Sequence, residues 1–140
     1  MPDTMRTGGC LCGAVRYEIT AEPDYAGLCY CADCQKVSGS AFVGVVGVPA
    51  SGFKVTGEAS RYVCKALGGG DAVRNSCPTC HSLLFGGIVG QDTSHTVYVG
   101  GLDDGSWFAP SFAIFASRRP AWAPEPPPGV AVFAEMPPGR

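Results

Sequence analysis

Alternating hydrophobic and polar residues along the chain predict short β-strands. Residues 14–20 place Val15, Tyr17 and Ile19 on one face and polar side chains on the other, which is the two-residue period of a half-buried strand. The valine-rich run at residues 41–48 is continuously apolar. It predicts a strand buried on both faces, near the centre of a sheet.

Five further segments read as strands, each bounded by glycine or another turn residue. They are residues 53–56, 60–66, 71–76, 82–88 and 95–102. One helical turn is expected to begin at Ala32 and Asp33 and to end by Gly39. No long segment has a 3.6-residue period and no internal repeat is present, so the pattern predicts a mainly β fold of short antiparallel sheets with little helix.

Composition limits the possible classes of protein. The chain has 140 residues, of which 46% are hydrophobic and 16% charged, as expected of one globular domain over residues 1–140. The net charge of −2 argues against a nucleic-acid partner. The longest apolar run, residues 41–50, is too short to span a membrane. The N-terminus lacks the apolar core of a signal peptide, so we expect a cytoplasmic location.

The C-terminal end differs in composition from the rest of the chain. Seven of the twelve prolines lie in residues 120–140. Such a segment favours extended backbone. We therefore expect a core of about residues 8–122, with residues 123–140 forming a tail that is laid across the body or partly loose.

The cysteines are the strongest chemical signal in the sequence. Seven of the eight fall into three tight clusters, whereas a disulfide scaffold spreads its cysteines among separate loops. Clustering favours a shared metal ion over disulfides. The clusters are Cys10 and Cys12, then Cys29, Cys31 and Cys34, then Cys77 and Cys80.

The two cysteine pairs together make up the donor set of one closed zinc site. Zinc in structural sites takes four ligands in a tetrahedron, and short C-x-C and C-x2-C turns each supply two. The simplest partition therefore joins Cys10 and Cys12 to Cys77 and Cys80. Cys77 follows Cys12 by 65 residues, so such a site would staple distant parts of the chain and couple metal binding to folding.

The remaining cluster, Cys29, Cys31 and Cys34, has three thiols and no obvious fourth ligand. Three protein ligands and one open position is the pattern of catalytic zinc. Alternatively, Cys64, His81 or His95 closes the site. The strand-like surroundings of Cys64 favour a buried free thiol, while His81 is expected near the first site and His95 at a surface or strand end. Spacing leaves both readings open, and it does not match the usual ferredoxin runs.

The order of the motifs resembles one family closely. "GGCLCGAVRYEI", "CYCADCQKVSGSAF", "CPTCHSLL", "GGLDD" and "SRRPAW" are similar to the glutathione-dependent formaldehyde-activating enzymes, a group that includes centromere protein V. The resemblance implies a zinc-stapled β-tent fold with two zinc ions. It places the structural ion on Cys10, Cys12, Cys77 and Cys80, and the active-site ion on the catalytic Cys29, Cys31 and Cys34.

The resemblance also implies an activity. It is that of a carbon–sulfur lyase, which forms or cleaves the S-hydroxymethyl adduct of a small thiol, such as glutathione, with formaldehyde or a related aldehyde. Lys36 and Arg61 are candidate partners for the carboxylates of glutathione. The alternatives are a non-catalytic zinc-stabilised binding module and a redox-sensing thiol protein.

The chain departs from the family pattern at three positions. Tyr30 and His81 stand where histidine and glycine, respectively, are common, and a C-terminal histidine is replaced near Ala113. These departures concern the substrate more than the fold or the metals.

Overall fold

The computed structural model describes residues 5–137, which form a mainly β protein with a single α-helix in that range. Residues 1–4 and 138–140, the extreme ends of the expected domain and of its Pro-rich tail, lie outside the described residues. The strands are β1 (Arg6–Gly9), β2 (Arg16–Ile19), β3 (Tyr25–Cys29), β4 (Val43–Pro49), β5 (Phe53–Thr56), β6 (Ser60–Lys65), β7 (Asp71–Ser76), β8 (Leu83–Gly86), β9 (Ser94–Tyr98), β10 (Phe112–Ile114) and β11 (Ala131–Val132). The helix α1 is Ala32–Ser38, and three 3₁₀ turns are η1 (Ala50–Gly52), η2 (Val99–Gly101) and η3 (Ala116–Arg118).

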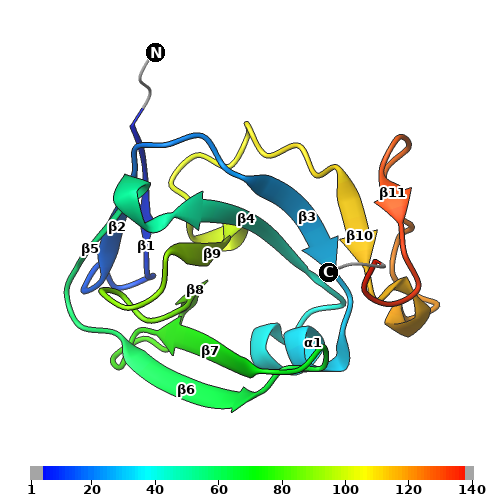
Figure 1. Ribbon diagram of the computed structural model, residues 1–140, viewed down its shortest axis with the longest axis horizontal. Coiled ribbons are helices and arrows are strands. Elements are labelled where there is room, and N and C mark those ends of the chain that lie inside the picture. Colours follow the sequence, from blue (N-terminus) through cyan, green and yellow to red (C-terminus); the bar gives the residue numbers. More distant parts are fainter. Residues whose placement is uncertain (1–4, 138–140) are drawn as a thin grey trace.

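The strands form two sheets (Figure 1). The larger has eight strands in the order β11-β10-β3-β4-β9-β8-β7-β6, and the smaller has the order β1-β2-β5. Among the described residues, β10 is the exception to the predicted antiparallel pairing, because it runs parallel to both β3 and β11. The remaining strand pairs are antiparallel, as the sequence predicts.

All seven strands predicted from the hydrophobic pattern are present, together with the short helix. The central position expected for residues 41–48 is also confirmed, because β4 lies between β3 and β9. Four strands were not predicted: β1, β3, β10 and β11. Each lacks the alternation or the length that marks a strand in sequence, since their residues read RTGG, YAGLC, FAI and AV.

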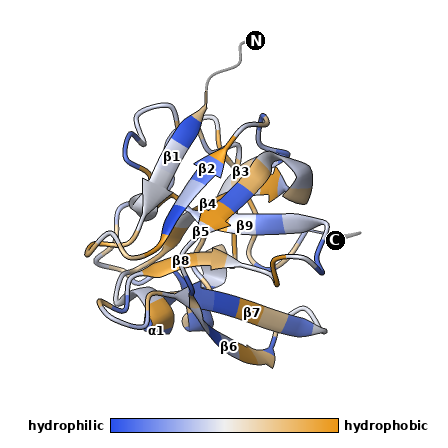
Figure 2. Ribbon diagram, turned by 90° about the vertical axis from the view of Figure 1, so that its left-hand side faces the viewer, coloured by the Kyte–Doolittle hydropathy of each residue, from blue (hydrophilic) through white to orange (hydrophobic). Residues whose placement is uncertain are grey.

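The main core lies between the small sheet and the middle of the large one. Val15, Tyr17 and Ile19, the face predicted to be apolar, are each at most 1% exposed and pack against Val46, Leu84 and other residues of β4, β8 and β9. Figure 2 shows β8 coloured hydrophobic along most of its length, whereas β7 carries hydrophilic segments. This burial joins the two sheets.

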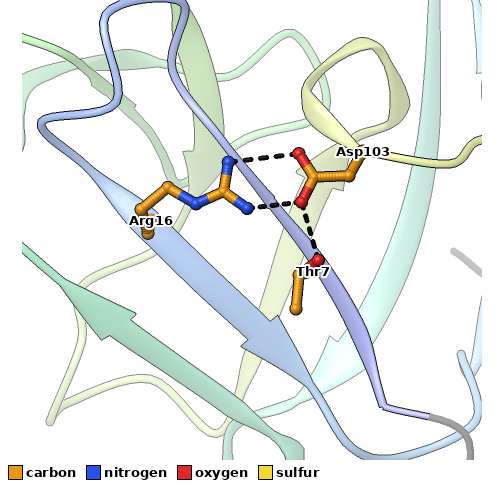
Figure 3. Close-up of polar contacts among 3 residues, drawn as sticks. All are labelled: Thr7, Arg16 and Asp103. Carbon is orange, nitrogen blue, oxygen red and sulfur yellow. Dashed lines mark hydrogen bonds and ion pairs between the residues drawn. The ribbon is translucent and has the colours of Figure 1, made fainter.

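A polar contact ties the small sheet to the loop that follows η2 (Figure 3). The guanidinium of Arg16 on β2 donates to both carboxylate oxygens of Asp103, one bond being 3.1 Å long. The hydroxyl of Thr7 on β1 donates to the same carboxylate at 2.7 Å. These bonds hold strand β1, which runs directly into Cys10, in a fixed place.

The Pro-rich tail is laid across the body. Strand β11 pairs with β10, and the Phe133 N–H donates to the Ala113 carbonyl at 2.9 Å. Farther along, the Ala116 N–H donates to Phe133 and the Ser117 N–H to Ala134. The described part of the tail is therefore attached by backbone hydrogen bonds. Among residues 5–137, no helix has the length and apolar character needed to cross a bilayer.

Candidate metal centre and active site

Four cysteine sulfurs meet where the start of the chain contacts the turn between β7 and β8. The ligand atoms of Cys10, Cys12, Cys77 and Cys80 all lie within 4.8 Å of one another. Cys10 Sγ and Cys12 Sγ are 3.7 Å apart, as are Cys12 Sγ and Cys77 Sγ. A tetrahedral zinc with Zn–S bonds of 2.3 Å requires sulfurs about 3.8 Å apart, so the spacing of the donors fits that ion.

The backbone around this first site is arranged for thiolates. The Val15 N–H donates to Cys10 Sγ at 3.2 Å, and the N–H groups of Thr79 and Cys80 donate to Cys77 Sγ at 3.3 and 3.4 Å. The bond from Val15 is the main reason that the pKa of Cys10 is lowered. N–H groups directed at sulfur favour its charged form, which is the form that binds a metal.

His81 adopts the left-handed backbone conformation, with φ of 65°. Its N–H donates to the Cys77 carbonyl, which closes the turn that carries Cys77 and Cys80. Glycine adopts this conformation without strain and histidine does so at a modest cost. The left-handed backbone at this position therefore explains why the family resemblance leads one to expect glycine here. The side chain is exposed, beside the first site's turn.

The remaining three cysteines converge where β3 ends and α1 begins. Cys29 is the last residue of β3, Cys31 is the N-cap of α1, and Cys34 lies in the first turn of the helix. Cys31 Sγ accepts a hydrogen bond from the Cys34 N–H at 3.1 Å, and Gly39 ends the helix with φ of 69°. A cap at one end and a left-handed glycine at the other fix this short helix, and the helix fixes the triad.

The triad is buried and apolar in its surroundings. Its three sulfurs lie within 4.8 Å of one another, with Cys34 Sγ and Cys29 Sγ 3.4 Å apart. Val43 and Val45 of β4 pack against them. Hydrogen bonds from Cys29 and then Cys34 lower the pKa of Cys31 well below that of a free thiol, while hydrogen bonds within the triad raise the pKa of Cys29 and Cys34, so the three thiols together stabilise one thiolate. Such a donor set suits zinc and other thiophilic ions.

No fourth cysteine, histidine, aspartate or glutamate of residues 5–137 joins the triad cluster. Cys64 lies on β6, half-buried and outside both clusters, as a free thiol. His95 was expected at a surface or strand end, but it is only 2% exposed and its Nδ1 bonds to the Gly86 carbonyl at 2.9 Å. The place near the start of β9 agrees with the expectation, but a surface position was wrong, because the His95 ring packs at a tilt against Phe53 and edge-on against Phe85.

One cation whose charge acts on the triad was not singled out by the sequence. Arg74 on β7 is half-buried, donates to Cys64 Sγ at 3.5 Å, and its charge acts on Cys34 and Cys31. Lys36 and Arg61, the cations expected from sequence, are both exposed and line none of the cavities that contact the triad. Nothing in the residues around Arg74 distinguishes it from the other cations, because its position depends on strand pairing.

A cavity of about 570 Å³ opens beside the triad, and Cys29 and Cys34 form part of its wall. Its other walls come from β4, β9, β10 and the Pro-rich tail. Two aromatic rings, Tyr25 and Phe112, lie in it 6.1 Å apart. A side-chain carbon at Gly27 would overlap the Phe112 ring, and one at Gly47 would overlap Tyr25, so these glycines make room for the rings.

Tyr30 faces away from this cavity. It is 1% exposed and belongs to a separate cluster that contains Leu28, Phe42 and Ala113. Tyr30 and Ala113 are two of the three positions where the chain departs from the family pattern, and here they share one core. Both residues therefore pack in this core, and neither lines the cavity beside the triad.

Gln35 is a further residue that the sequence did not single out. Its Nε2 donates to the Tyr30 carbonyl at 2.8 Å and to the Arg118 carbonyl at 2.9 Å. One amide thus ties the triad loop to η3. Position alone in "CADCQK" gives no sign of this role, because the second acceptor is 83 residues away.

The fold and the cysteine clusters define a mainly β protein with two sites of the kind that hold thiophilic metals. Within that class, the family model described as "Glutathione-dependent formaldehyde-activating enzyme" matches residues 5–118. The chain therefore belongs to this family, as the motifs predicted.

Two other comparisons add less. A crystal structure of a Rhodobacter sphaeroides protein is similar, with a TM-score of 0.52 and 21% identity over 69% of this chain and 87% of that one. At this identity the likeness shows a shared fold. No curated protein sequence matches the chain.

Proposed function

We propose that this protein is a zinc-dependent carbon–sulfur lyase that joins a small thiol, such as glutathione, to formaldehyde or a related aldehyde, or cleaves the adduct. Two zinc ions per chain are part of the proposal: a structural ion on Cys10, Cys12, Cys77 and Cys80, and an active-site ion on the triad. The supporting observation is that the triad offers three sulfurs and two of them, Cys29 and Cys34, line a cavity.

Zinc held by the triad would favour the thiolate form of an incoming thiol near neutral pH. The chemistry is then an addition: a C–S bond forms at the aldehyde carbon, the C=O double bond becomes a single bond, and the proton lost by the thiol ends on the new hydroxyl. Cleavage is the reverse. Atoms balance without an oxidant or reductant.

Tyr98 is placed to stabilise the oxygen on which negative charge develops. It lines the cavity together with Cys34, and burial is the main reason that its pKa is raised to about 12. The phenol therefore stays protonated at neutral pH and can donate a hydrogen bond to the aldehyde oxygen. Thr96, whose hydroxyl lies 2.6 Å from that of Tyr25, lines the same wall.

Arg74 supplies positive charge next to a cluster that accumulates negative charge. Three thiolates and a fourth bound thiolate around one divalent ion have a net charge of −2, and a cation a few ångströms away lowers the electrostatic cost.

None of the eight cysteines forms a disulfide, which supports a reducing compartment such as the cytoplasm.

Metal analysis and a rate measurement test the proposal together. We expect two zinc ions per chain, with X-ray absorption showing four sulfurs at one site and three sulfurs plus a lighter atom at the other. Two-dimensional exchange NMR should then show faster formation of S-hydroxymethylglutathione from glutathione and formaldehyde. Tyr98→Phe should slow the exchange about 10- to 100-fold while leaving zinc content unchanged.

The control is a pair of cysteine variants. Cys31→Ala should abolish the acceleration and remove one zinc, whereas Cys64→Ala, which removes a thiol outside both clusters, should change neither. An unchanged rate in Cys31→Ala would contradict the proposed activity. A triad zinc with four protein ligands would instead indicate the non-catalytic binding module.

A further inference from the structure

The cavity beside the triad has a lining that differs from what glutathione and formaldehyde need. Its hydrophobic wall includes Val45, Phe112, Ile114, Phe133 and Met136. The polar groups on the described lining are the hydroxyls of tyrosine, threonine and serine and the two triad sulfurs, and no charged side chain is among them. The surface next to the reacting sulfur atoms is therefore mainly apolar.

The cavity has space and apolar surface that neither formaldehyde nor glutathione would use fully. Formaldehyde has only two heavy atoms, whereas a space of about 570 Å³ is in the range that holds a whole small ligand. Glutathione would fill more of it, but it carries two carboxylates, and a carboxylate placed against an apolar wall without a cation is costly. An apolar group gains free energy in the same place.

Part of this apolar wall comes from the Pro-rich tail, and hydrogen bonds hold that part of the tail in place. Phe133 and Met136 come from the Pro-rich segment, and Phe133 is held at both of its backbone groups, by Ala113 and by Ala116. The hydroxyl of Ser117 also donates to the carboxylate of Glu135. Val132, between two lining residues, points elsewhere and is 54% exposed.

We propose that the substrate of the triad site carries an apolar group, aromatic or branched, of about six to ten carbon atoms, and that this group occupies the cavity lined by the tail. This inference rests on the proposed function, and it assigns that site a substrate class. The apolar group is carried either by the aldehyde or by the thiol. The aldehyde carbon and the thiol sulfur both react next to the triad, so a substituent on either one could enter the cavity.

Binding measurements on the full-length, zinc-loaded protein test the inference without relying on turnover. In the thiol arm, calorimetry compares 2-phenylethanethiol with 2-mercaptoethanol and glutathione. In the aldehyde arm, 3-phenylpropanal is compared with formaldehyde, each without a thiol, so that no adduct forms. We expect the phenyl compound to bind at least tenfold more tightly in one arm, because its ring leaves water for the apolar wall. The arm that shows the preference identifies the source of the group.

A matched pair of tail variants ties the preference to this cavity. Met136→Glu places a charge on the lining and should reduce the phenyl preference about tenfold, whereas Val132→Glu places the same charge on the same segment outside the cavity and should leave it intact. The side chains of Val132 and Met136 are both partly exposed to solvent, so both variants should fold. Their melting temperatures check this.

Equal binding of phenyl and small compounds in both arms would overturn the inference, and so would equal effects of the two variants. The proposed activity fails separately. If glutathione and formaldehyde still react faster with the protein while phenyl probes show no advantage, the substrate class alone is wrong. If phenyl probes bind tightly but Cys31→Ala leaves the exchange rate unchanged, the activity alone is wrong.

Discussion

The two cysteine clusters use the same side chains at similar spacing, but they meet different surroundings. At the first site four sulfurs face one another, and backbone N–H groups of the connecting turns donate to them. At the triad three sulfurs lie together, two of them line a mainly apolar cavity that Tyr98 also lines, and the charge of Arg74 acts on Cys34. The first arrangement offers the four donors that a tetrahedral zinc ion takes. The second has three cysteine donors and no fourth cysteine, histidine or carboxylate among residues 5–137.

The largest expected effect comes from deleting one sulfur at each site. Cys77→Ala should lower the free energy of unfolding by more than about 4 kcal/mol or prevent folding, because the closed site joins distant parts of the chain. Cys31→Ala should cost only about 1–2 kcal/mol, since it affects one loop and one short helix. Chemical denaturation and zinc content measure both. Equal losses of unfolding free energy in Cys77→Ala and Cys31→Ala would contradict the view that the first site stabilises the fold more than the triad does.

Next in size is the effect of Arg74 on thiol binding. Arg74→Met should weaken the binding of a thiol to the zinc-loaded protein about tenfold, or about 1.4 kcal/mol, because the triad then binds an anion without a neighbouring cation. Calorimetry across a pH series should show the thiol binding as thiolate only at higher pH, which a purely structural role would not cause.

Two control variants accompany Arg74→Met. Arg74→Lys keeps the charge and should restore part of the affinity. Arg61→Met removes an exposed cation from the neighbouring strand β6 and should have no effect. An unchanged pH profile in Arg74→Met would limit Arg74 to a packing role.

A smaller effect is expected at the turn of the first site. His81→Gly should raise the free energy of unfolding by up to about 1 kcal/mol, since glycine adopts the left-handed conformation of this residue without strain. Thr79→Gly, at an exposed residue of the same turn outside the left-handed region, should instead destabilise the protein. Thermal denaturation distinguishes them, and a destabilised His81→Gly would show that the histidine side chain contributes to the first site.

The smallest expected effect is the pH dependence of the Arg16–Asp103 contact near the first site. The Arg16 guanidinium is the main reason that the pKa of Asp103 is lowered. The contribution is therefore fully present above the ordinary carboxyl pKa of about 3.8 and is lost as the pH falls below it. Between pH 5 and 3 the melting temperature of the wild type should fall slightly more than that of Asp103→Asn. Identical slopes would show that the contact contributes nothing.

Local pattern was sufficient for the elements whose signal lies within a few residues. Alternation predicted β2, and a continuous valine run predicted the central strand β4. The helix boundaries followed from Ala32 and Gly39, because caps act on neighbouring backbone groups. Strand β3 was missed although it carries Cys29, since YAGLC shows no alternation and is a strand only because β4 and β10 flank it.

The sequence by itself determined the local thiol pairs and the triad, because thiols separated by one or two residues are brought together by any tight turn. It also determined the mainly β class, since a two-residue period can bury one face only as a strand. Tertiary structure decided what surrounds the triad. Arg74, Tyr98 and the tail residue Phe133 come from β7, β9 and the C-terminal segment. Pairing between strands that are distant in the sequence places these residues near Cys34. The spacing of residues along the chain does not predict that pairing.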